Sequence, residues 1–460
     1  MYQPLQTPNA PVSTRRAEGK ALRKQVPRTS HATLPPTEGR DPVGVLEASN
    51  EGRVEDLIPI RMGRMATSPF AYYRGAAAMM AADLAHTPTS GLTSQICGDA
   101  HLANFGLFAS PERRLVFGVN DFDETLPGPW EWDVKRLTAS IVIAGRENGF
   151  SDAEARSAAV ATSRSYRQHM ADFALSRVLD TWYATVDLDA IAAYLDATTF
   201  EATKKTTNKA RRHDHLRALS KLTEVVDGQH RIRHDPPLLV PADPADHGID
   251  TAGLIEVYDG YRASLPADRR TLLDRYRLVE MAHKVVGVGS VGTRCWVGLF
   301  QGDGLEQGSD PLFLQMKEAG PSVLERHLGA AEEGLHGQRV VHGQHLMQAV
   351  SDIFLGYTVR PDTGRHFYVR QLHDMKGSFA IPLMGPPELT YYGGLCGWTL
   401  ARAHARSGDA AKISGYLGNG DTFDHAVADF AEGYADLNAA DHAALLAAIE
   451  SGRLPATHGI

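Results

Sequence analysis

Residues 97–104 have the sequence Cys97-Gly98-Asp99-Ala100-His101-Leu102-Ala103-Asn104, directly after a short apolar run that ends at Ile96. The run predicts a strand, and the glycine and polar residues after it predict a loop. An aspartate that precedes an asparagine by five positions in such a loop has the spacing of a phosphotransferase catalytic loop. The same residue types are also common in ordinary turns and caps, so this spacing needs support from the rest of the chain.

In phosphotransferase chemistry the loop aspartate accepts or orients the proton of the attacking hydroxyl group. The asparagine binds a magnesium ion, which neutralises phosphate charge in the transition state. We therefore predict that Asp99 is the catalytic base, with His101 beside it in the catalytic loop, and that Asn104 is a metal ligand.

Support comes from an acidic segment farther along the chain. Residues 114–120 are apolar and β-branched and predict a buried strand that ends at Asp121-Phe122-Asp123. Kinases deliver their metal aspartate from the end of such a strand. Magnesium takes one or two carboxylates together with substrate phosphates, so Asn104 and Asp121 are a sufficient protein contribution. Asp123 is predicted as a further metal ligand, although an exposed or capping aspartate explains its presence equally well.

A glycine-rich run occurs at 287–292, Gly287-Val288-Gly289-Ser290-Val291-Gly292. The residues after it are aromatic and strand-like, which indicates a strand, a glycine turn and a second strand, as in the hairpin that covers phosphates in kinases. A dinucleotide site would instead open a helix at the last glycine. The next predicted strand, 311–316, ends at Lys317, where a kinase lysine reaches the phosphates. We expect the nucleotide-binding residues to be Gly287, Gly289, Ser290, Gly292, Lys317 and its ion-pair partner Glu325.

Length and composition limit the class of protein. A chain of 460 residues is too long for one core and fits two or three packed units. A net charge of -8 argues against nucleic acid as the main partner. The three cysteines form neither a disulfide framework nor a zinc spacing, which fits a reducing compartment. No apolar run long enough to span a bilayer and no apolar core of a secretory signal are present, so we expect a cytoplasmic protein without a membrane partner.

Changes in composition along the chain predict its organisation. Residues 1–45 are rich in Pro, Ser, Thr and basic residues, and we expect a flexible arm or a strap over the surface. Residues 234–247 are rich in Pro and Asp, and we expect an interdomain connection there, because consecutive prolines stop helices and strands. The predicted units are the arm at 1–45, a catalytic-loop and helical lobe at 46–240, a β-rich nucleotide-binding lobe at 250–380, and C-terminal helices at 388–455 that rejoin the helical lobe.

These motifs carry two resemblances. From about Arg23 to the last helices the chain resembles the bacterial family filed as domain of unknown function 2252, DUF2252. The motifs are Ser68-Pro-Phe-Ala-Tyr-Tyr-Arg-Gly75, Cys97-Gly-Asp-Ala-His-Leu-Ala-Asn-Phe-Gly106, Asn120-Asp-Phe-Asp-Glu124, 287–294 and Tyr368-Val-Arg-Gln-Leu-His-Asp-Met-Lys-Gly-Ser378. More distantly, the Gly-Asp-x-His-x-x-Asn core and Asp121 are similar to aminoglycoside and choline kinases. That resemblance implies a two-lobed, protein-kinase-like α+β fold that uses ATP and Mg2+.

The order of the motifs differs from that of kinases. In kinases the glycine turn and the lysine precede the catalytic loop, whereas here they follow it, so we expect a circular permutation, which packed folds tolerate. One cleft must then hold all the motifs, with the Lys317 ammonium on the order of 10 Å or less from the Asp121 carboxylate. The helix at 395–404 should pack beside the strand that ends at Ile96, where an unpermuted kinase would run directly from one to the other.

The expected function is ATP- and Mg2+-dependent transfer of a phosphoryl group to an unidentified hydroxyl acceptor. Two alternative functions compete with it. Asp121 and Asp123 also fit the D-x-D-x-T motif of haloacid-dehalogenase-type phosphohydrolases, as nucleophile and acid/base. That fold needs alternating strands and helices after the motif, and residues 130–230 are mostly helical in pattern. The other alternative is an inactive kinase-like scaffold that binds a nucleotide. Arg74 and Arg370, together with His373 and Lys376, are candidates for binding the acceptor, and nucleotidyl transfer is a further reaction that this fold supports.

Overall fold

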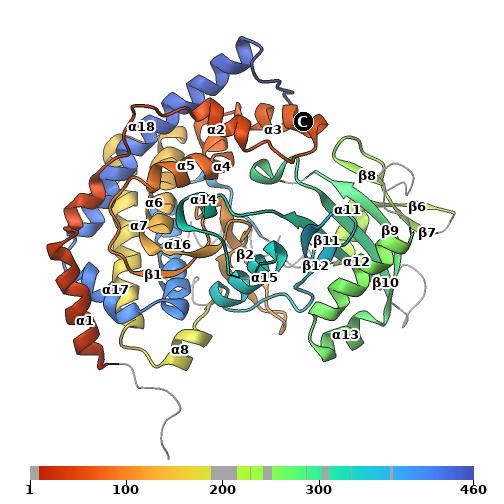
Figure 1. Ribbon diagram of the computed structural model, residues 1–460, viewed down its shortest axis with the longest axis horizontal. Helices are drawn as coiled ribbons and strands as arrows, with labels where there is room; N and C mark the ends of the chain where they lie inside the picture. The colour runs from red at the N-terminus through yellow and green to blue at the C-terminus, as the bar shows by residue number, and fades with distance from the viewer. Residues whose placement is uncertain are drawn as a thin grey trace, which may run out of the picture.

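The computed structural model describes residues 10–187, 215–227, 229–241, 251–285, 287–302, 310–332, 334–372 and 377–460, and every structural statement refers to these residues. The chain forms a helical part and a sheet part that lie side by side (Figure 1). Helices and antiparallel strands are largely segregated, so the predicted α+β class is confirmed. His373 and Lys376, and most of a basic run at 204–221, lie outside the described residues.

The sheet part is built on six strands that pair antiparallel in the order β12-β13-β11-β10-β9-β8. Successive side chains of a strand point to opposite faces, so each face needs its own cover. Helices α12 and α13 cover one face through Tyr261 and Leu265, which pack with Trp296 and Phe300. Helix α11 covers part of the other face through Leu219 and Leu222. The bounds are β8 Leu239–Pro241, β9 Tyr276–Lys284, β10 Cys295–Gly302, β11 Pro311–Ala319, β12 Gly356–Arg360, β13 Arg365–Gln371, α11 His215–Leu222, α12 Thr251–Ser264 and α13 Ala267–Leu273.

The helical part packs four long helices around one apolar core, with α6 buried along nearly its whole length. Its C-terminal members come from the end of the chain, as the sequence predicts for residues after 388. The shorter helices α4, α5, α8 and α17 and a segment of small sheets complete this part. The bounds are α4 Pro69–Gly75, α5 Ala77–Leu84, β1 Thr93–Ile96, β2 Phe105–Ala109, β3 Leu115–Val119, β4 Leu126–Pro129, α6 Trp130–Glu147, α7 Asp152–Phe173, α8 Val178–Tyr183, β5 Val186–Asp187, α16 Pro386–Ser407, α17 Ala410–Leu417 and α18 Thr422–Glu450.

The N-terminal segment is helical and packs on the C-terminal helices, which its composition does not predict. Helix α1 lies along α17 (Figure 1), where the two backbones approach closely at glycines. A Cβ on Gly19 would lie 1.9 Å from the carbonyl oxygen of Lys412, and a Cβ on Gly415 would lie 2.1 Å from that of Arg16. Only glycine fits at either position. The segment is therefore a strap held by packing, with α1 at Val12–Ala21, α2 at Pro42–Ala48 and α3 at Ile58–Met65.

Two local expectations are wrong in detail. The proline-rich segment at 234–247 contributes strand β8, because Pro241 stands at the end of an edge strand, where a missing N–H does not interrupt the sheet. Strands β6 (Thr223–Val226) and β7 (Gln229–Ile232) pair antiparallel, so a β-ribbon takes the place of the expected end of the helical region. Ile232 packs with the sheet, so the part of the chain that joins the sheet begins well before residue 240.

The expected neighbour of β1 is present. Helix α16 contacts β1, and the backbone N–H of Gln95 donates a hydrogen bond of 2.9 Å to the hydroxyl oxygen of Ser407 at the end of that helix. A helix near the C-terminus thus ends where the strand before the catalytic loop begins, although more than three hundred positions separate Gln95 and Ser407 in sequence.

The burial of His31 gives a prediction about the strap. His31 is buried, and its Nε2 lies 2.6 Å from the Tyr416 hydroxyl. Burial, and secondarily the charge of Lys135, lower the pKa of His31 to about 3. The unfolded chain therefore binds more protons between that value and the ordinary histidine pKa, so stability falls as pH falls through this window. In His31→Gln the free energy of unfolding should decline less steeply, by up to about 1.4 kcal/mol per pH unit, measured by urea unfolding.

The control for this experiment is His425→Gln, which removes a half-exposed histidine from α18. Equal slopes for His31→Gln and the wild-type protein would show that the strap is not packed around His31.

Candidate active site

The predicted catalytic loop, residues 97–104, is held by a buried carboxylate of helix α6. Asp133 accepts hydrogen bonds from the backbone N–H groups of Cys97, at 2.8 Å, and Gly98, at 2.9 Å. His404 on α16 lies 3.2 Å from the same carboxylate. Gly98 has φ = 76°, and a Cβ there would lie 2.5 Å from the Glu124 carbonyl oxygen, so only glycine fits. The loop leaves β1 in a conformation fixed by helices from two distant parts of the chain.

Asp99 is paired with a cation that the sequence does not single out. Arg136, one turn after Asp133, forms a short ion pair with the Asp99 carboxylate and donates a hydrogen bond of 3.0 Å to the Tyr73 carbonyl oxygen. Burial raises the pKa of Asp99, against the lowering effect of Arg136, which makes this carboxylate a stronger base than usual. His101 Nε2 lies 3.7 Å from Asp99, and burial lowers the pKa of His101 far enough to keep the ring neutral.

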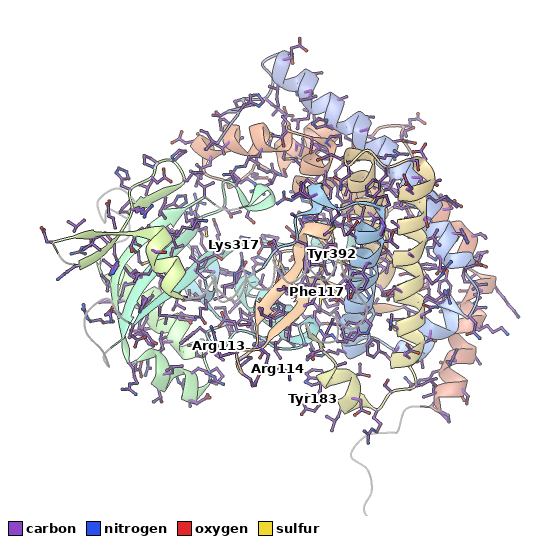
Figure 2. All side chains as sticks on the ribbon, turned by 180° about the vertical axis from the view of Figure 1, so that it is seen from behind. Arg113, Arg114, Phe117, Tyr183, Lys317 and Tyr392 are labelled. Atoms are coloured by element: carbon purple, nitrogen blue, oxygen red, sulfur yellow. The ribbon has the colours of Figure 1, made fainter. Side chains whose placement is uncertain are left out.

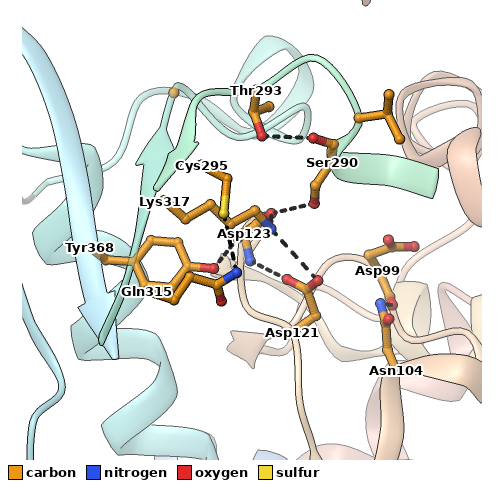
Figure 3. Close-up of polar contacts among 12 residues, drawn as sticks. Asp99, Asn104, Asp121, Asp123, Ser290, Thr293, Cys295, Gln315, Lys317 and Tyr368 are labelled. Atoms are coloured by element: carbon orange, nitrogen blue, oxygen red, sulfur yellow. Dashed lines mark hydrogen bonds and ion pairs between the residues drawn. The ribbon is translucent and has the colours of Figure 1, made fainter. Parts of the chain in front are cut away.

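The acidic segment after β3 meets the lysine of β11. Lys317 Nζ forms a short ion pair with Asp123 and lies 3.9 Å from Asp121 Oδ2, well within the expected range (Figure 3). The Tyr368 hydroxyl donates a hydrogen bond of 2.8 Å to Asp123, and the Ser290 hydroxyl lies 3.3 Å from it. The sheet part and the helical part are thus joined through one cluster of charges, and Lys317 lies between them (Figure 2).

The two carboxylates of this cluster differ in basicity. Burial and the neighbouring Asp123 raise the pKa of Asp121. Burial also acts to raise the pKa of Asp123, but the attraction of Lys317 outweighs it and holds that pKa below its usual value. Burial opposes the charge on Lys317, yet Asp121 and Asp123 raise its pKa overall. The ammonium therefore stays charged, and Asp123 is its principal counter-ion.

The glycine-rich run forms the expected turn between β9 and β10. The two strands pair antiparallel, with one turn of 3-10 helix at Val288–Ser290, and no helix opens at Gly292, where φ is 88°. The tip of the turn is fixed to the N-terminal segment. The Val54 amide donates a hydrogen bond of 2.8 Å to the Gly292 carbonyl oxygen, and the Arg53 guanidinium bonds the carbonyl oxygen of Val291.

Glu325 is not the partner of Lys317, which corrects the expectation. Its carboxylate lies 3.7 Å from Arg339 Nε and accepts the Ser322 N–H at 2.9 Å. It begins the short helix α14 (Glu325–Leu328), and Arg339 reaches it from α15 (His336–Met347). Arg339 also donates hydrogen bonds to the carbonyl oxygens of Asp123, at 2.8 Å, and Thr125, at 2.6 Å. Glu325 therefore orients the arginine that holds the acidic segment, while Asp123 takes the lysine.

The predicted residues converge on one cavity of about 560 Å³. Arg74 and Arg370, the two arginines predicted to bind the acceptor, line it. Arg370 also donates hydrogen bonds of 3.1 Å to the Gln315 side chain and to the Asn120 carbonyl oxygen. Asn104 donates its side-chain N–H to the Asp99 carbonyl oxygen at 2.8 Å, which orients the amide. The predicted residues that line the cavity are Arg74, Asp99, His101, Asn104, Asp121, Asp123, Gly287, Gly289, Ser290, Lys317 and Arg370; Gly292 and Glu325 do not.

Four residues of this arrangement were not predicted from the sequence. Asp133 and Arg136 lie on α6 one turn apart, and a buried helix that carries charged residues among apolar ones was the available signal. Tyr368 lies within a quoted motif. No sequence pattern indicated Arg339, because its hydrogen bonds go to backbone carbonyl groups.

A family model described as an uncharacterized protein conserved in bacteria, DUF2252, matches residues 53–448. The chain belongs to this family. The matched range contains the predicted catalytic loop, the acidic segment, the glycine turn and Lys317, so nearly the whole cavity of this DUF2252 protein, Ser49 excepted, is built from family sequence. Comparisons with curated proteins and with solved structures found no match. No described helix has the length and apolarity needed to cross a membrane.

The contacts of Asp133 predict how strongly it stabilises the loop. In Asp133→Asn the side chain loses its charge and one of its two acceptor atoms, so a buried backbone N–H loses its partner. We expect a loss of about 1–3 kcal/mol in the free energy of unfolding, measured by chemical denaturation. Asp152→Asn, at an aspartate whose side chain is 83% exposed, is the matched control and should change stability little. Equal stability of the two variants would contradict the role of Asp133.

Proposed function

We propose that this protein is an ATP- and Mg2+-dependent phosphotransferase that acts in the cytoplasm on a small hydroxyl-bearing acceptor. The observation that carries the proposal is the ion-paired cluster of Lys317, Asp121 and Asp123 in the cavity that also holds Asp99 and Asn104. These residues come from segments far apart in the sequence. Phosphoryl transfer needs a cation on the phosphates, metal ligands and a base in one place, and this cavity supplies all three.

We further propose that the fold is a circularly permuted, two-lobed, kinase-like fold. In support, the strands run in the order strand, glycine turn, strand, strand with lysine, and Lys317 pairs in register with Cys295 just after the turn. After the last strand, β13, the chain enters α16, and the end of α16 meets β1. A direct connection from α16 to β1 would give the motif order of a kinase.

The donor set fits a magnesium ion. Among the described residues no group of three or more Asp, Glu, His or Cys side chains is arranged to hold a metal by itself. Magnesium is usually held by one or two carboxylates and by substrate phosphates, so such a cage is not required. Asp121 and Asn104, with Asp123 as a further ligand, are the hard oxygen donors that would hold it. Bound there, the ion supplies neutralisation of the phosphate charge.

The residues of the chain have distinct roles in the proposed reaction. Lys317 binds the phosphates, and the glycine turn covers them. The acceptor hydroxyl oxygen forms a bond to the γ-phosphorus of ATP, the bond from that phosphorus to the β,γ-bridging oxygen breaks, and ADP leaves. Asp99 takes the hydroxyl proton, and its raised pKa favours this step. Arg136 holds the Asp99 carboxylate in place for the acceptor.

Two features weigh against the hydrolase alternative. Strand β3, which delivers Asp121, pairs antiparallel with both of its neighbours, β2 and β5. The residues that follow β4, from 130 to 187, are mainly the helices α6 and α7. A haloacid-dehalogenase fold would place Asp121 at the end of a parallel strand in alternating βα units.

The first experiment measures magnesium-dependent nucleotide binding. We expect ATP to bind the wild-type protein, and Lys317→Met to weaken binding by about tenfold or more, because the ammonium contacts the phosphates. Lys412→Met, at a partly exposed lysine paired with Glu18, is the matched control. Absence of ATP binding to the wild-type protein, measured by calorimetry, would refute the proposal.

The second experiment separates chemistry from binding. Asp99→Asn keeps the shape of the side chain beside the buried Arg136, so the fold should survive, and we expect turnover of labelled ATP to fall by about 10²–10⁴-fold. ATP binding should change little. Undiminished turnover in the folded variant would end the assignment of Asp99 as the base.

The third experiment distinguishes the two enzyme classes. Asp121→Asn should weaken ATP binding chiefly when magnesium is present, because it removes a ligand of the ion. The hydrolase alternative predicts instead a phosphorylated Asp121 in the wild-type protein. Acid-quenched mass spectrometry of the wild-type protein with labelled substrate decides, and a phosphate on Asp121 would favour the hydrolase.

A further inference from the structure

Three arginines line the cavity without a carboxylate partner. Arg53, Arg61 and Arg74 come from the segment between α2 and α5, and each contributes to the cavity wall. Among the described residues none of the three forms an ion pair. Arg40, by contrast, pairs with Asp83 and Asp441. Arg61 is buried and Arg53 and Arg74 are half-buried. Enclosed cations without an ion-pair partner are unfavourable, so a cavity wall that carries three of them is suited to an anion.

Hydrogen bonds to neutral groups hold these arginines in place. Arg61 donates to the Ser49 hydroxyl at 3.0 Å and to the Gly75 carbonyl oxygen at 3.1 Å, and Arg53 donates to the Ser49 carbonyl oxygen at 2.8 Å. These contacts fix the guanidinium groups without a direct ion pair, although Glu124 lies near enough to attract Arg53 and Asp99 near enough to attract Arg74. Nitrogen atoms also remain for a ligand, since the buried Nε atoms of Arg61 and Arg74 have no hydrogen-bond partner.

The same region offers a further unused donor or acceptor close to the catalytic base. His101 is 3% exposed, lines the cavity, and its Nδ1 has no hydrogen-bond partner. Burial lowers the pKa of all three arginines, which is the cost that a bound anion would offset. These observations indicate a polar site that is assembled but incomplete without a ligand.

The arginines lie next to the reacting end of the proposed site. Arg136 bonds both Asp99 and the carbonyl oxygen of Tyr73, the residue before Arg74, so the C-terminal end of the arginine segment lies beside the proposed catalytic carboxylate. Helix α4, which carries Arg74, contacts the glycine turn, and Arg53 bonds the tip of that turn. Lys317 and the glycine turn already serve the nucleotide phosphates. The three arginines are therefore placed for an additional anion, on the acceptor.

We propose that the acceptor carries an anionic group, a phosphate or a carboxylate, which Arg53, Arg61 and Arg74 bind while its hydroxyl group lies at Asp99. This inference rests on the proposed phosphotransferase function and names its substrate class. Guanidinium groups bind both anions through paired hydrogen bonds, so the arginine cluster recognises the chemistry that the two share. The reaction then converts the hydroxyl group to a phosphate monoester and leaves the anionic group unchanged.

The test uses small probes with and without an anionic group, titrated into the full-length protein by calorimetry. Glycerol 3-phosphate represents a phosphate, glycerate a carboxylate, glycerol a neutral compound and choline a cation. All titrations are made with Mg2+ and a saturating non-hydrolysable ATP analogue, so that the nucleotide site is filled. We expect one or both anions to bind, and glycerol and choline not to bind. The anion that binds identifies the preferred group.

Variants assign the binding to the arginines. Arg74→Gln and Arg53→Gln should each weaken anion binding by about tenfold or more, whereas Arg74→Lys should retain part of it. Arg177→Gln, at an exposed arginine paired with Asp180, makes the same change of charge on α8 and should have no effect. Arg61 is almost fully buried and is left intact, because its loss would also disturb packing.

The outcomes separate this inference from the function on which it rests. If the ATP analogue binds but displaces the anions, or if both glutamine variants bind the anions normally, the arginines do not hold the acceptor and the inference is wrong. Absence of anion binding to the wild-type protein is equally decisive. If the analogue itself does not bind, the proposed function fails, and the acceptor role falls with it.

Discussion

The contact between Lys317 and the pair Asp121 and Asp123 is the constraint on which the arrangement of this molecule depends. The lysine belongs to the six-stranded sheet and the carboxylates to the segment after β3, so the contact joins the two parts of the chain. Both partners are largely enclosed, and a buried charge without its partner is strongly unfavourable. The two parts therefore meet in the arrangement that brings these groups together, and the cavity lies around them.

Helix α15 and the N-terminal segment hold this contact from two sides. Arg339 fixes the backbone of the acidic segment through two carbonyl oxygens, and Glu325 orients Arg339. Arg53 and Val54 fix the tip of the glycine turn. The turn is thus bonded to the same segment that supplies the unpaired arginines. Movement of that segment would alter the glycine turn and the arginine cluster together, so the two proposed sites are mechanically linked.

The sequence predicted those parts of the site that carry their own local signal. The spacing of Asp99 and Asn104, the apolar strand before Asp121 and the strand after the glycine run are short-range patterns, and the structure places them as expected. Which charged residues pair with one another was less predictable from the sequence. The sequence predicted Glu325 as the partner of Lys317 and Asp123 as a metal ligand, whereas the packing of α15 gives Glu325 to Arg339 and leaves Asp123 to the lysine. Arg136 and Asp133 act through contacts with residues that are distant in sequence, which no local pattern reveals.

The close packing of α1 on α17 has a consequence for synthesis of the chain. Helix α1 is made long before α17, but Gly19 meets the backbone of Lys412 in that later helix. Chains emerge from the ribosome from the N-terminus, and domains generally fold as they appear. Here α1 reaches its packed position only after α17 has been made, and β1 likewise gains its contact with Ser407 only after α16 has been made. The order of the segments therefore delays the final packing of the helical part until α16 and α17 are present.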